Sequence, residues 1–158
     1  MTYIYENQSA DKEKLMEIVN KEKYGLAANL SRRGFASNNG FRGVSVTTWP
    51  DSFSNNNGEL GASVSTGFNG ISYNSGMHGI AANTGNCGKS ITTRKESIAI
   101  SVGMKSKAQG AKGCWLVLAE WDEIGLSIKC VKSFKVDGKR IKADTLYTLK
   151  DGKAVECE

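Results

Sequence analysis

The chain has 158 residues and a formal net charge of +5, and 39% of its residues are hydrophobic, with 18 glycines and one proline. This length allows one domain, but the low hydrophobic fraction argues against a large conventional core and for close backbone packing. No apolar run reaches the roughly 18 residues of a membrane span, and the first residues lack the apolar core of a signal peptide. We therefore expect a cytoplasmic protein that contacts no membrane.

The N-terminal segment predicts a short helix. Ser9–Lys21 begins with a residue that can cap a helix, and a partial apolar face follows, made of Leu15, Met16, Ile18 and Val19. We expect this helix to cover the open end of the domain that follows.

From Glu22 to Ala111 the chain repeats a pattern of nine residues ten times without an insertion. The fourth place of each repeat is Gly or Ser, the sixth is Ala or Ser, and the first is usually Gly. A fixed period of this kind indicates a solenoid, and nine residues fit one short strand and one tight turn. We expect the strand at places four to eight, with places four and six facing a tight interior. We expect the first-place glycines to supply the positive φ of the turn.

The seventh place shows a second period of eighteen residues. In alternate repeats it is apolar, as Ala28, Val46, Val64, Ala82 and Ile100. In the other repeats it is more polar, as Ser37, Asn55, Tyr73, Ile91 and Gln109. One coil should therefore have eighteen residues and two strands, one on each face, so that five coils make a rod about 24 Å long. The Asn and Thr residues that end the repeats should stack in hydrogen-bonded ladders.

The repeat stops after Gly113, and three strand-like segments follow. The segments CWLVLAEW, LSIKCVKSFKV and TLYTLKDGKAVE are separated by the turn sequences DEIG and DGKR, and the last contains KDGK. The sequence thus predicts an all-β fold. A β-solenoid (β-roll) of ten nonapeptide repeats at 22–111 lies between a helical cap at 1–21 and a small antiparallel β cap at 112–158.

Two resemblances add to this interpretation. The segment SIAISVGMKSKAQGAKGCWLVLAEWD, followed by FKVDGKRIKADTLYTLKDGKAVE, resembles an uncharacterised family of phages, prophages and gut bacteria. That resemblance implies a viral or mobile-element origin and no particular activity. The Ser-x-Ala spacing at Ser97–Ala99 and Ser106–Ala108 resembles the β-roll heads of trimeric autotransporter adhesins, although those repeat in sevens and fourteens. This second resemblance implies a β-roll and trimerisation.

Catalytic and metal-binding residues find little support in the sequence. The one histidine, His78, falls in a turn, where no nucleophile or carboxylate set can be assembled around it. The four cysteines, Cys87, Cys114, Cys130 and Cys157, lie far apart without a C-x-x-C pair, which indicates free thiols. We therefore expect a protein that is not an enzyme and needs no cofactor or metal.

Two sets of residues are candidates for binding. The nine Lys/Arg and four Asp/Glu from Glu22 to Ala111 give the repeat a net charge of +5, and its basic residues are candidates for contact with a polyanion. They are Arg32, Arg33, Arg42, Lys89, Arg94, Lys95, Lys105 and Lys107. The alternative is that these charges only keep the rod soluble. At the apolar fifth place, Ile71, Ile80 and Ile98 are candidates for an oligomer interface, since such patches are rare on monomers.

Three functions fit these features. The first is a phage-type binding protein that inhibits a host defence system, either by blocking a nucleic-acid-guided nuclease or by sequestering a nucleotide signal. Its partner would be a host protein, a nucleoprotein complex, a nucleic acid or a nucleotide. The second is a trimeric β-roll module of a virion fibre or an adhesin-like assembly, which an uncovered fifth place would favour. The third is an ice-binding rod, suggested by the Thr and Asn ladders.

Overall fold

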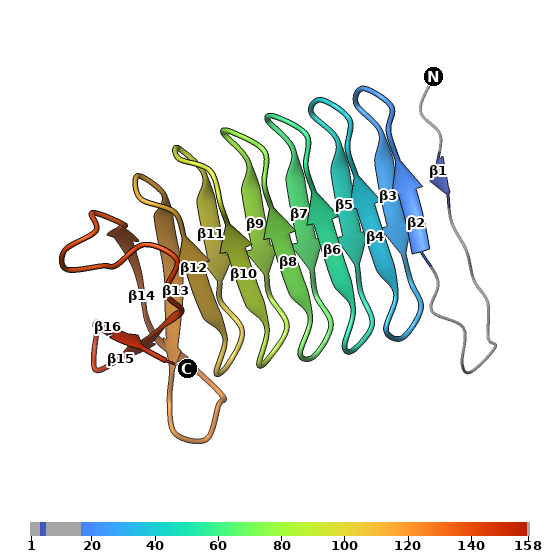
Figure 1. Cartoon of the computed structure of the whole chain (residues 1–158). Helices are drawn as coiled ribbons and strands as arrows, with labels where there is room; N and C mark the ends of the chain where they lie inside the picture. The colour runs from blue at the N-terminus through green and yellow to red at the C-terminus, as the bar shows by residue number, and fades with distance from the viewer. Residues whose placement is uncertain (1–3, 6–16, 158) are drawn as a thin grey trace.

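The computed structural model describes residues 4–5 and 17–157, which form β-strands and contain no helix. Figure 1 shows a rod of stacked coils, with the N-terminus at one end and the C-terminal strands at the other. The all-β solenoid that the repeat predicts is confirmed. Its long sides are two sheets of parallel strands, joined by tight turns.

From β1 to β13 the strands alternate between the two sheets. Sheet A runs in the order β1 (Ile4–Tyr5), β3 (Leu26–Asn29), β5 (Val44–Thr47), β7 (Ala62–Ser65), β9 (Ile80–Asn83), β11 (Ile98–Ser101), β13 (Trp115–Trp121) and β14 (Ile128–Lys135). Sheet B runs in the order β2 (Glu17–Asn20), β4 (Phe35–Asn38), β6 (Phe53–Asn56), β8 (Ile71–Asn74), β10 (Lys89–Thr92), β12 (Lys107–Gly110), β15 (Tyr147–Lys150) and β16 (Lys153–Glu156). Within the repeat, each strand pairs in parallel with the strand eighteen residues later, as Val44 does with Ala62. The eighteen-residue coil is therefore confirmed.

The predicted N-terminal helix is wrong over residues 17–20. These residues form β2, which pairs in parallel with β4 and places Ile18 beside Ala36. Ile18 is buried and Val19 is exposed, as alternation along a strand requires. Because this segment continues the nine-residue register one repeat earlier, pairing with the next coil decides its conformation. The rest of the predicted helix, residues 9–16, lies outside the described residues.

The interior of the rod is narrow and lined by small or polar side chains. Places four, six and eight face inward, and the strand itself starts at place five rather than four. The sixth-place residues are fully buried, and their hydroxyls bridge the two sheets: Ser45 Oγ lies 2.8 Å from Ser54 Oγ, and Ser63 Oγ donates to the Ser54 carbonyl. The prediction of a tight interior at places four and six is confirmed.

Asparagine at the eighth place fills many of the corners of the coils. The Asn74 amide is buried, and its Nδ2 donates to the carbonyls of Gly61 and Ile80 at 3.0 and 3.4 Å. Its Oδ1 accepts the Gly76 N–H at 2.9 Å. A Cβ at Gly79 would lie 2.4 Å from that Oδ1, so the fourth place must be glycine here. The eighth-place Asn and Thr are thus interior residues, and exposed hydrogen bonds between coils occur at place nine, where Asn57 Nδ2 donates to Asn39 Oδ1, and at place three, where Asn69 Nδ2 donates to Asp51 Oδ1.

Positive φ occurs at the third place of the repeat, not at the first as expected. Ten non-glycine residues have φ between 54° and 62° there: Tyr24, Arg33, Arg42, Asp51, Leu60, Asn69, His78, Cys87, Glu96 and Lys105. This conformation turns the N–H along the rod, so that Leu60 N donates to the Met77 carbonyl of the next coil at 2.9 Å. Where the first place is glycine, it is needed for space, because a Cβ at Gly58 would lie 1.8 Å from the Gly40 carbonyl oxygen.

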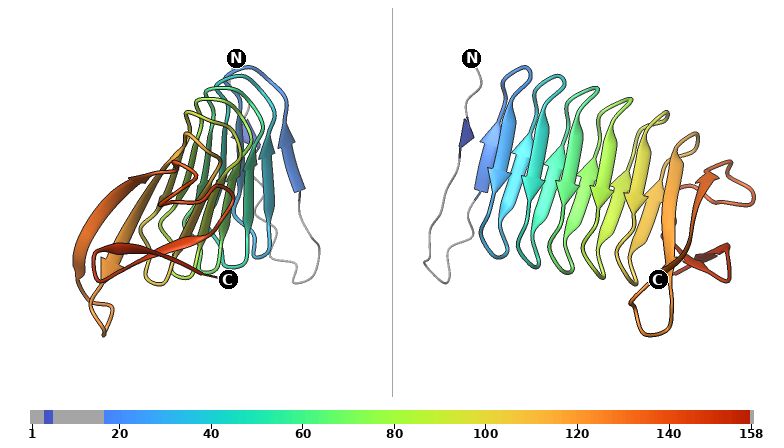
Figure 2. Two further views of the ribbon diagram at one scale, coloured as in Figure 1. Left: turned by 60° about the vertical axis from the view of Figure 1, so that its left-hand side comes forward. Right: turned by 180° about the vertical axis from the view of Figure 1, so that it is seen from behind.

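The C-terminal unit extends both sheets with antiparallel strands. β14 pairs with β13 in sheet A, and β15 pairs with β12 and β16 in sheet B. A conventional hydrophobic core fills the space between them, with Leu116, Leu118, Val136, Tyr147 and Leu149 all buried. The views in Figure 2 show this unit at one end of the rod, away from the N-terminal coils. The predicted antiparallel C-terminal unit is confirmed.

Candidate interaction surface

The outer side of sheet A is apolar along most of the rod. Places five and seven of its strands point outward because places six and eight point inward. From β3 to β13 these outward residues form two columns that we call the apolar face: Leu26, Val44, Ala62, Ile80, Ile98 and Trp115 in one, and Ala28, Val46, Val64, Ala82, Ile100 and Val117 in the other. No polar side chain interrupts either column.

The apolar face is open in the single chain. Ile80, Ile98 and Trp115 keep 39%, 36% and 43% of their surface exposed, and the others are half-buried by their neighbours on the sheet. Contiguous apolar surface of this extent is uncommon on soluble monomers and marks interaction sites. The apolar face is therefore the candidate functional site of the described residues.

The outer side of sheet B is mixed and provides a contrast. The rings of Phe35 and Phe53 stack with their centroids 5.3 Å apart, and Asn55 Nδ2 donates to Ser37 Oγ beside them. Further along, Lys89 and Lys107 stand at the same outward place. Sheet B thus alternates apolar and polar outward residues, whereas sheet A does not.

The structure separates the three isoleucines that we predicted at an oligomer interface. Ile80 and Ile98 are neighbours on the apolar face, but Ile71 lies on β8 in sheet B, on the opposite side of the rod. The sequence reasoning also left the seventh-place residues, such as Val64 and Ile100, out of the interface. Their period of eighteen was the signal that could have included them.

The predicted basic residues do not form one surface. Two rows of turns run along the rod: the first precedes the strands of sheet A and the second precedes the strands of sheet B. The first row carries Arg42, Arg94 and Lys95, and the second carries Arg32, Arg33 and Lys105. Lys89 and Lys107 are neighbours on sheet B.

Near the N-terminal end the first row also carries aromatic rings. Lys23 Nζ and the Arg42 guanidinium lie 5.5 and 5.3 Å from the centre of the exposed Phe41 ring, which makes a small cation–π cluster. The basic residues thus lie on three sides of the rod and form no single patch.

Ionisable side chains of the repeat form few contacts with one another. His78 Nδ1 lies 3.4 Å from Glu96 Oε2 between neighbouring turns, and both side chains are exposed. Within the described residues, no group of three or more His, Cys, Asp and Glu side chains could hold a metal ion, and the four cysteines form no disulfide. No helix that is long and apolar enough to cross a membrane occurs over residues 4–5 and 17–157.

Comparison with known proteins places the chain in no family: no family, curated protein or solved structure matches it. The resemblance of the C-terminal segments to a phage and gut-bacterial family therefore stays a prediction. The resemblance of the repeat to a β-roll agrees with the stacked parallel coils of the fold.

Proposed function

We propose that the protein is a non-enzymatic assembly module, and that its apolar face packs against the same face of a second copy. The observation that carries this proposal is the contrast between the two sheets, because sheet A has an uninterrupted apolar exterior from β3 to β13 and sheet B has none of that length. The apolar fifth place is uncovered in the single chain, which is the condition that favours an assembly role over the other predicted functions.

The chemistry of the apolar face favours a second copy as the partner. Apart from the indole N–H of Trp115, the face offers no side-chain hydrogen-bonding group and no charge with which to select a different protein, so recognition rests mainly on shape. Small and large side chains are neighbours on this face, so the large ones of one copy can fit the depressions of another: Ala62 makes a depression beside Ile80, and Ala82 makes one beside Ile100. In a two-fold arrangement, Ile80 of one copy can fill the depression at the partner's Ala62, and the reverse contact follows by symmetry.

The extent of the face agrees with a weak dimer. Six strands spaced about 4.8 Å apart, five about 13 Å long and β13 longer, give the apolar face from β3 to β13 a planar footprint of roughly 400 Å². Two copies would then bury on the order of 800 Å², which is in the range of weak, transient interfaces. Flat sheets that pack face to face lie about 10 Å apart, a spacing that aliphatic side chains fill.

A matched pair of substitutions tests the proposal. Ile80→Glu places a carboxylate in the middle of the apolar face, whereas Ile71→Glu makes the same change at the same place of the repeat on sheet B. By light scattering at micromolar concentrations we expect a dimeric mass for the parent and for Ile71→Glu, and a monomeric mass for Ile80→Glu. Circular dichroism should show that both variants keep the β fold.

A monomeric parent would overturn the proposal, and so would dissociation by both substitutions alike. A trimeric mass would contradict the pairwise contact and return the predicted fibre or adhesin-like module to first place. The roles as an inhibitor of a host defence system and as an ice-binding rod stay predictions. A pull-down from host lysate tests the first, and ice recrystallisation tests the second.

A further inference from the structure

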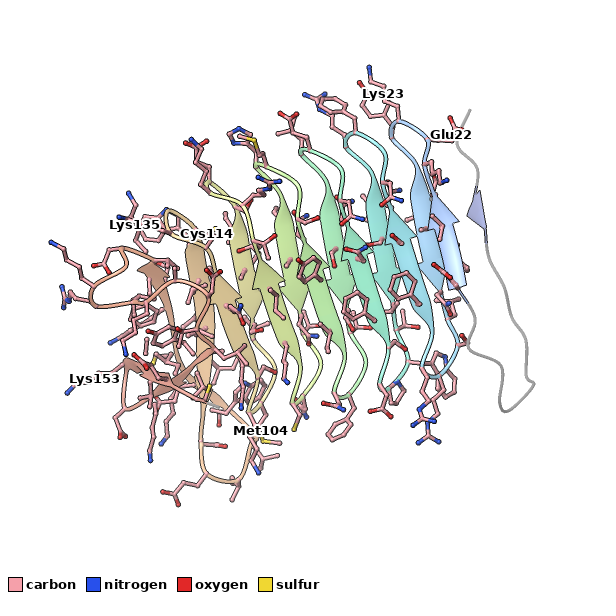
Figure 3. The ribbon with its side chains drawn as sticks, viewed as in Figure 1. Glu22, Lys23, Met104, Cys114, Lys135 and Lys153 are labelled. Carbon is pink, nitrogen blue, oxygen red and sulfur yellow. The ribbon has the colours of Figure 1, made fainter. Side chains whose placement is uncertain are left out.

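A second surface is an open hollow in the C-terminal unit, which adjoins the end of the apolar face where Lys135 pairs with Trp115. It lies between the end of β14, the turn at residues 137–141 and the β15–β16 hairpin, and it has a volume of about 480 Å³. Its lining includes Phe134, Lys135, Asp137, Arg140, Ile141 and Lys153. Figure 3 labels Lys135 and Lys153 at the end of the rod away from the N-terminal coils.

The hollow has an excess of positive charge that the chain does not neutralise. Lys135, Arg140 and Lys153 are exposed, and none of them is within 4 Å of a carboxylate of the described residues. The one carboxylate in the lining, Asp137, is already engaged: its Oδ1 accepts the backbone N–H groups of residues 139, 140 and 141 at 2.8 to 3.1 Å. The lining therefore carries three cationic side chains and one carboxylate, which leaves a net positive charge of two.

Nearby acidic groups are also held in contacts of their own. Glu156 accepts a hydrogen bond from Lys142 Nζ, with the closest N–O distance 2.9 Å. Glu120 Oε2 accepts the Gly152 N–H at 2.7 Å, and Lys132 Nζ donates to the Gly152 carbonyl at 2.8 Å. These contacts fix the β15–β16 hairpin against β13 and β14, so the walls of the hollow are set before any ligand arrives.

We infer that this hollow binds a small phosphate ester with an apolar or aromatic body, of which a mononucleotide is the representative. The three cations suit the phosphate, since lysine and arginine bind phosphate through charge-assisted hydrogen bonds. Phe134, Ile141 and Ala154 supply apolar lining for the body of the ligand. The hollow is larger than one phosphate group needs and falls in the size range of small-molecule sites.

The test is calorimetric titration of the full chain with AMP, adenosine and inorganic phosphate at low ionic strength. We expect AMP to bind saturably and at least about tenfold more tightly than either of its parts, since both halves of the hollow contribute. Arg140→Gln and Lys153→Gln should each weaken AMP binding about tenfold, the scale of one charge-assisted hydrogen bond. Lys105→Gln, which removes the same charge from an exposed turn of the solenoid, should leave AMP binding unchanged.

Three results would overturn this inference. One is the absence of saturable AMP binding up to millimolar concentration, and another is equal weakening by Lys105→Gln, which would show a general charge effect. The third is tight binding of a single-stranded oligonucleotide, lost in the Arg140 and Lys153 variants, without binding of AMP, because that would make the surface a nucleic-acid site. Thermal melts of each variant serve as the control: a melting temperature equal to that of the parent shows that the substitution changed a charge and left the fold intact. The substituted residues Arg140 and Lys153 lie outside the apolar face, so the outcome is independent of the proposed dimer.

Discussion

Exchanging one asparagine–glycine pair of the solenoid for a threonine–serine pair tests how its corners are built. In most repeats an eighth-place Asn is followed five residues later by a fourth-place Gly, as in Asn74 and Gly79. Where the eighth place is Thr or Ser, the fourth place can be Ser instead of Gly. The chain has three such pairs: Thr47 with Ser52, Thr92 with Ser97, and Ser101 with Ser106. Asn74→Thr and Gly79→Ser should therefore compensate each other.

The structure sets the size of each single effect. Asn74→Thr removes the amide that bonds the Gly61 carbonyl at 3.0 Å and the acceptor of the Gly76 N–H at 2.9 Å. Leaving such buried groups unpaired costs about 1–3 kcal/mol each, so we expect a loss of roughly 2–4 kcal/mol. Gly79→Ser places a Cβ 2.4 Å from the Asn74 amide oxygen, and such overpacking costs about 1–3 kcal/mol or more.

The double variant should lose less than the sum of the two. Once Thr replaces Asn74, the amide oxygen that the new Cβ would meet is gone, so we expect a coupling of about 1–3 kcal/mol in favour of the double variant. Guanidinium unfolding followed by circular dichroism, with free energies compared at one denaturant concentration, measures this cycle. Additive losses would refute the claim that contact with the eighth-place amide is what requires glycine at the fourth place.

Two further predictions concern the turns and the C-terminal unit. Gly58→Ala should lower the free energy of unfolding by about 1–3 kcal/mol, because its Cβ meets a carbonyl of the preceding coil. Leu60→Gly at the positive-φ place should stay within about 1 kcal/mol of the parent. Equal losses for the two variants in guanidinium unfolding would contradict this assignment. The hydrogen bond from Lys142 lowers the pKa of Glu156 below its ordinary value of 4.5, so that contact stabilises the fold above pH 4.5 and its contribution is lost as pH falls through the lowered pKa. Melting temperatures measured between pH 6 and pH 2 should fall less steeply for Glu156→Gln than for the parent; parallel curves would show that this pair does not link pH to stability.

The repeat made most of the solenoid predictable, because steric limits act on the same place in every coil. Small residues at places four and six could be recognised as an interior without any structure. The positive-φ place could not, since residues as different as Leu60, His78 and Glu96 occupy it. The conformation there is imposed by hydrogen bonding between coils, so it leaves no mark on the residue type. Glycine at the first place has a steric cause that the sequence does not distinguish from a conformational one.

The N-terminal helix was mispredicted for a related reason. Ile18 and Val19 fit one face of a helix and also fit the sixth and seventh places of a coil. Local pattern alone does not separate the two, and pairing with β4 decides between them. The candidate interface shows the same limit: Ile71 and Ile80 are equivalent in a period of nine and lie on opposite sheets in a period of eighteen.

The apolar face follows from how this chain fills its interior. In most domains aliphatic side chains are buried in the core, but here the sheets are so close that the sixth place accepts only Ala or Ser over Ala27 to Ala108, and the corners are filled by Asn, Thr or Ser. Backbone ladders and buried amides hold the coils together, and the larger aliphatic residues have only the outer sides available. On sheet B they are mixed with Lys, Asn and Gln, which keeps that side compatible with water. On sheet A they are not, so the free energy of covering them is still available to an association of the folded chain. A second copy is the partner whose surface has the same spacing between strands. The mass of the protein in solution therefore decides whether this interpretation holds, more than any single contact does.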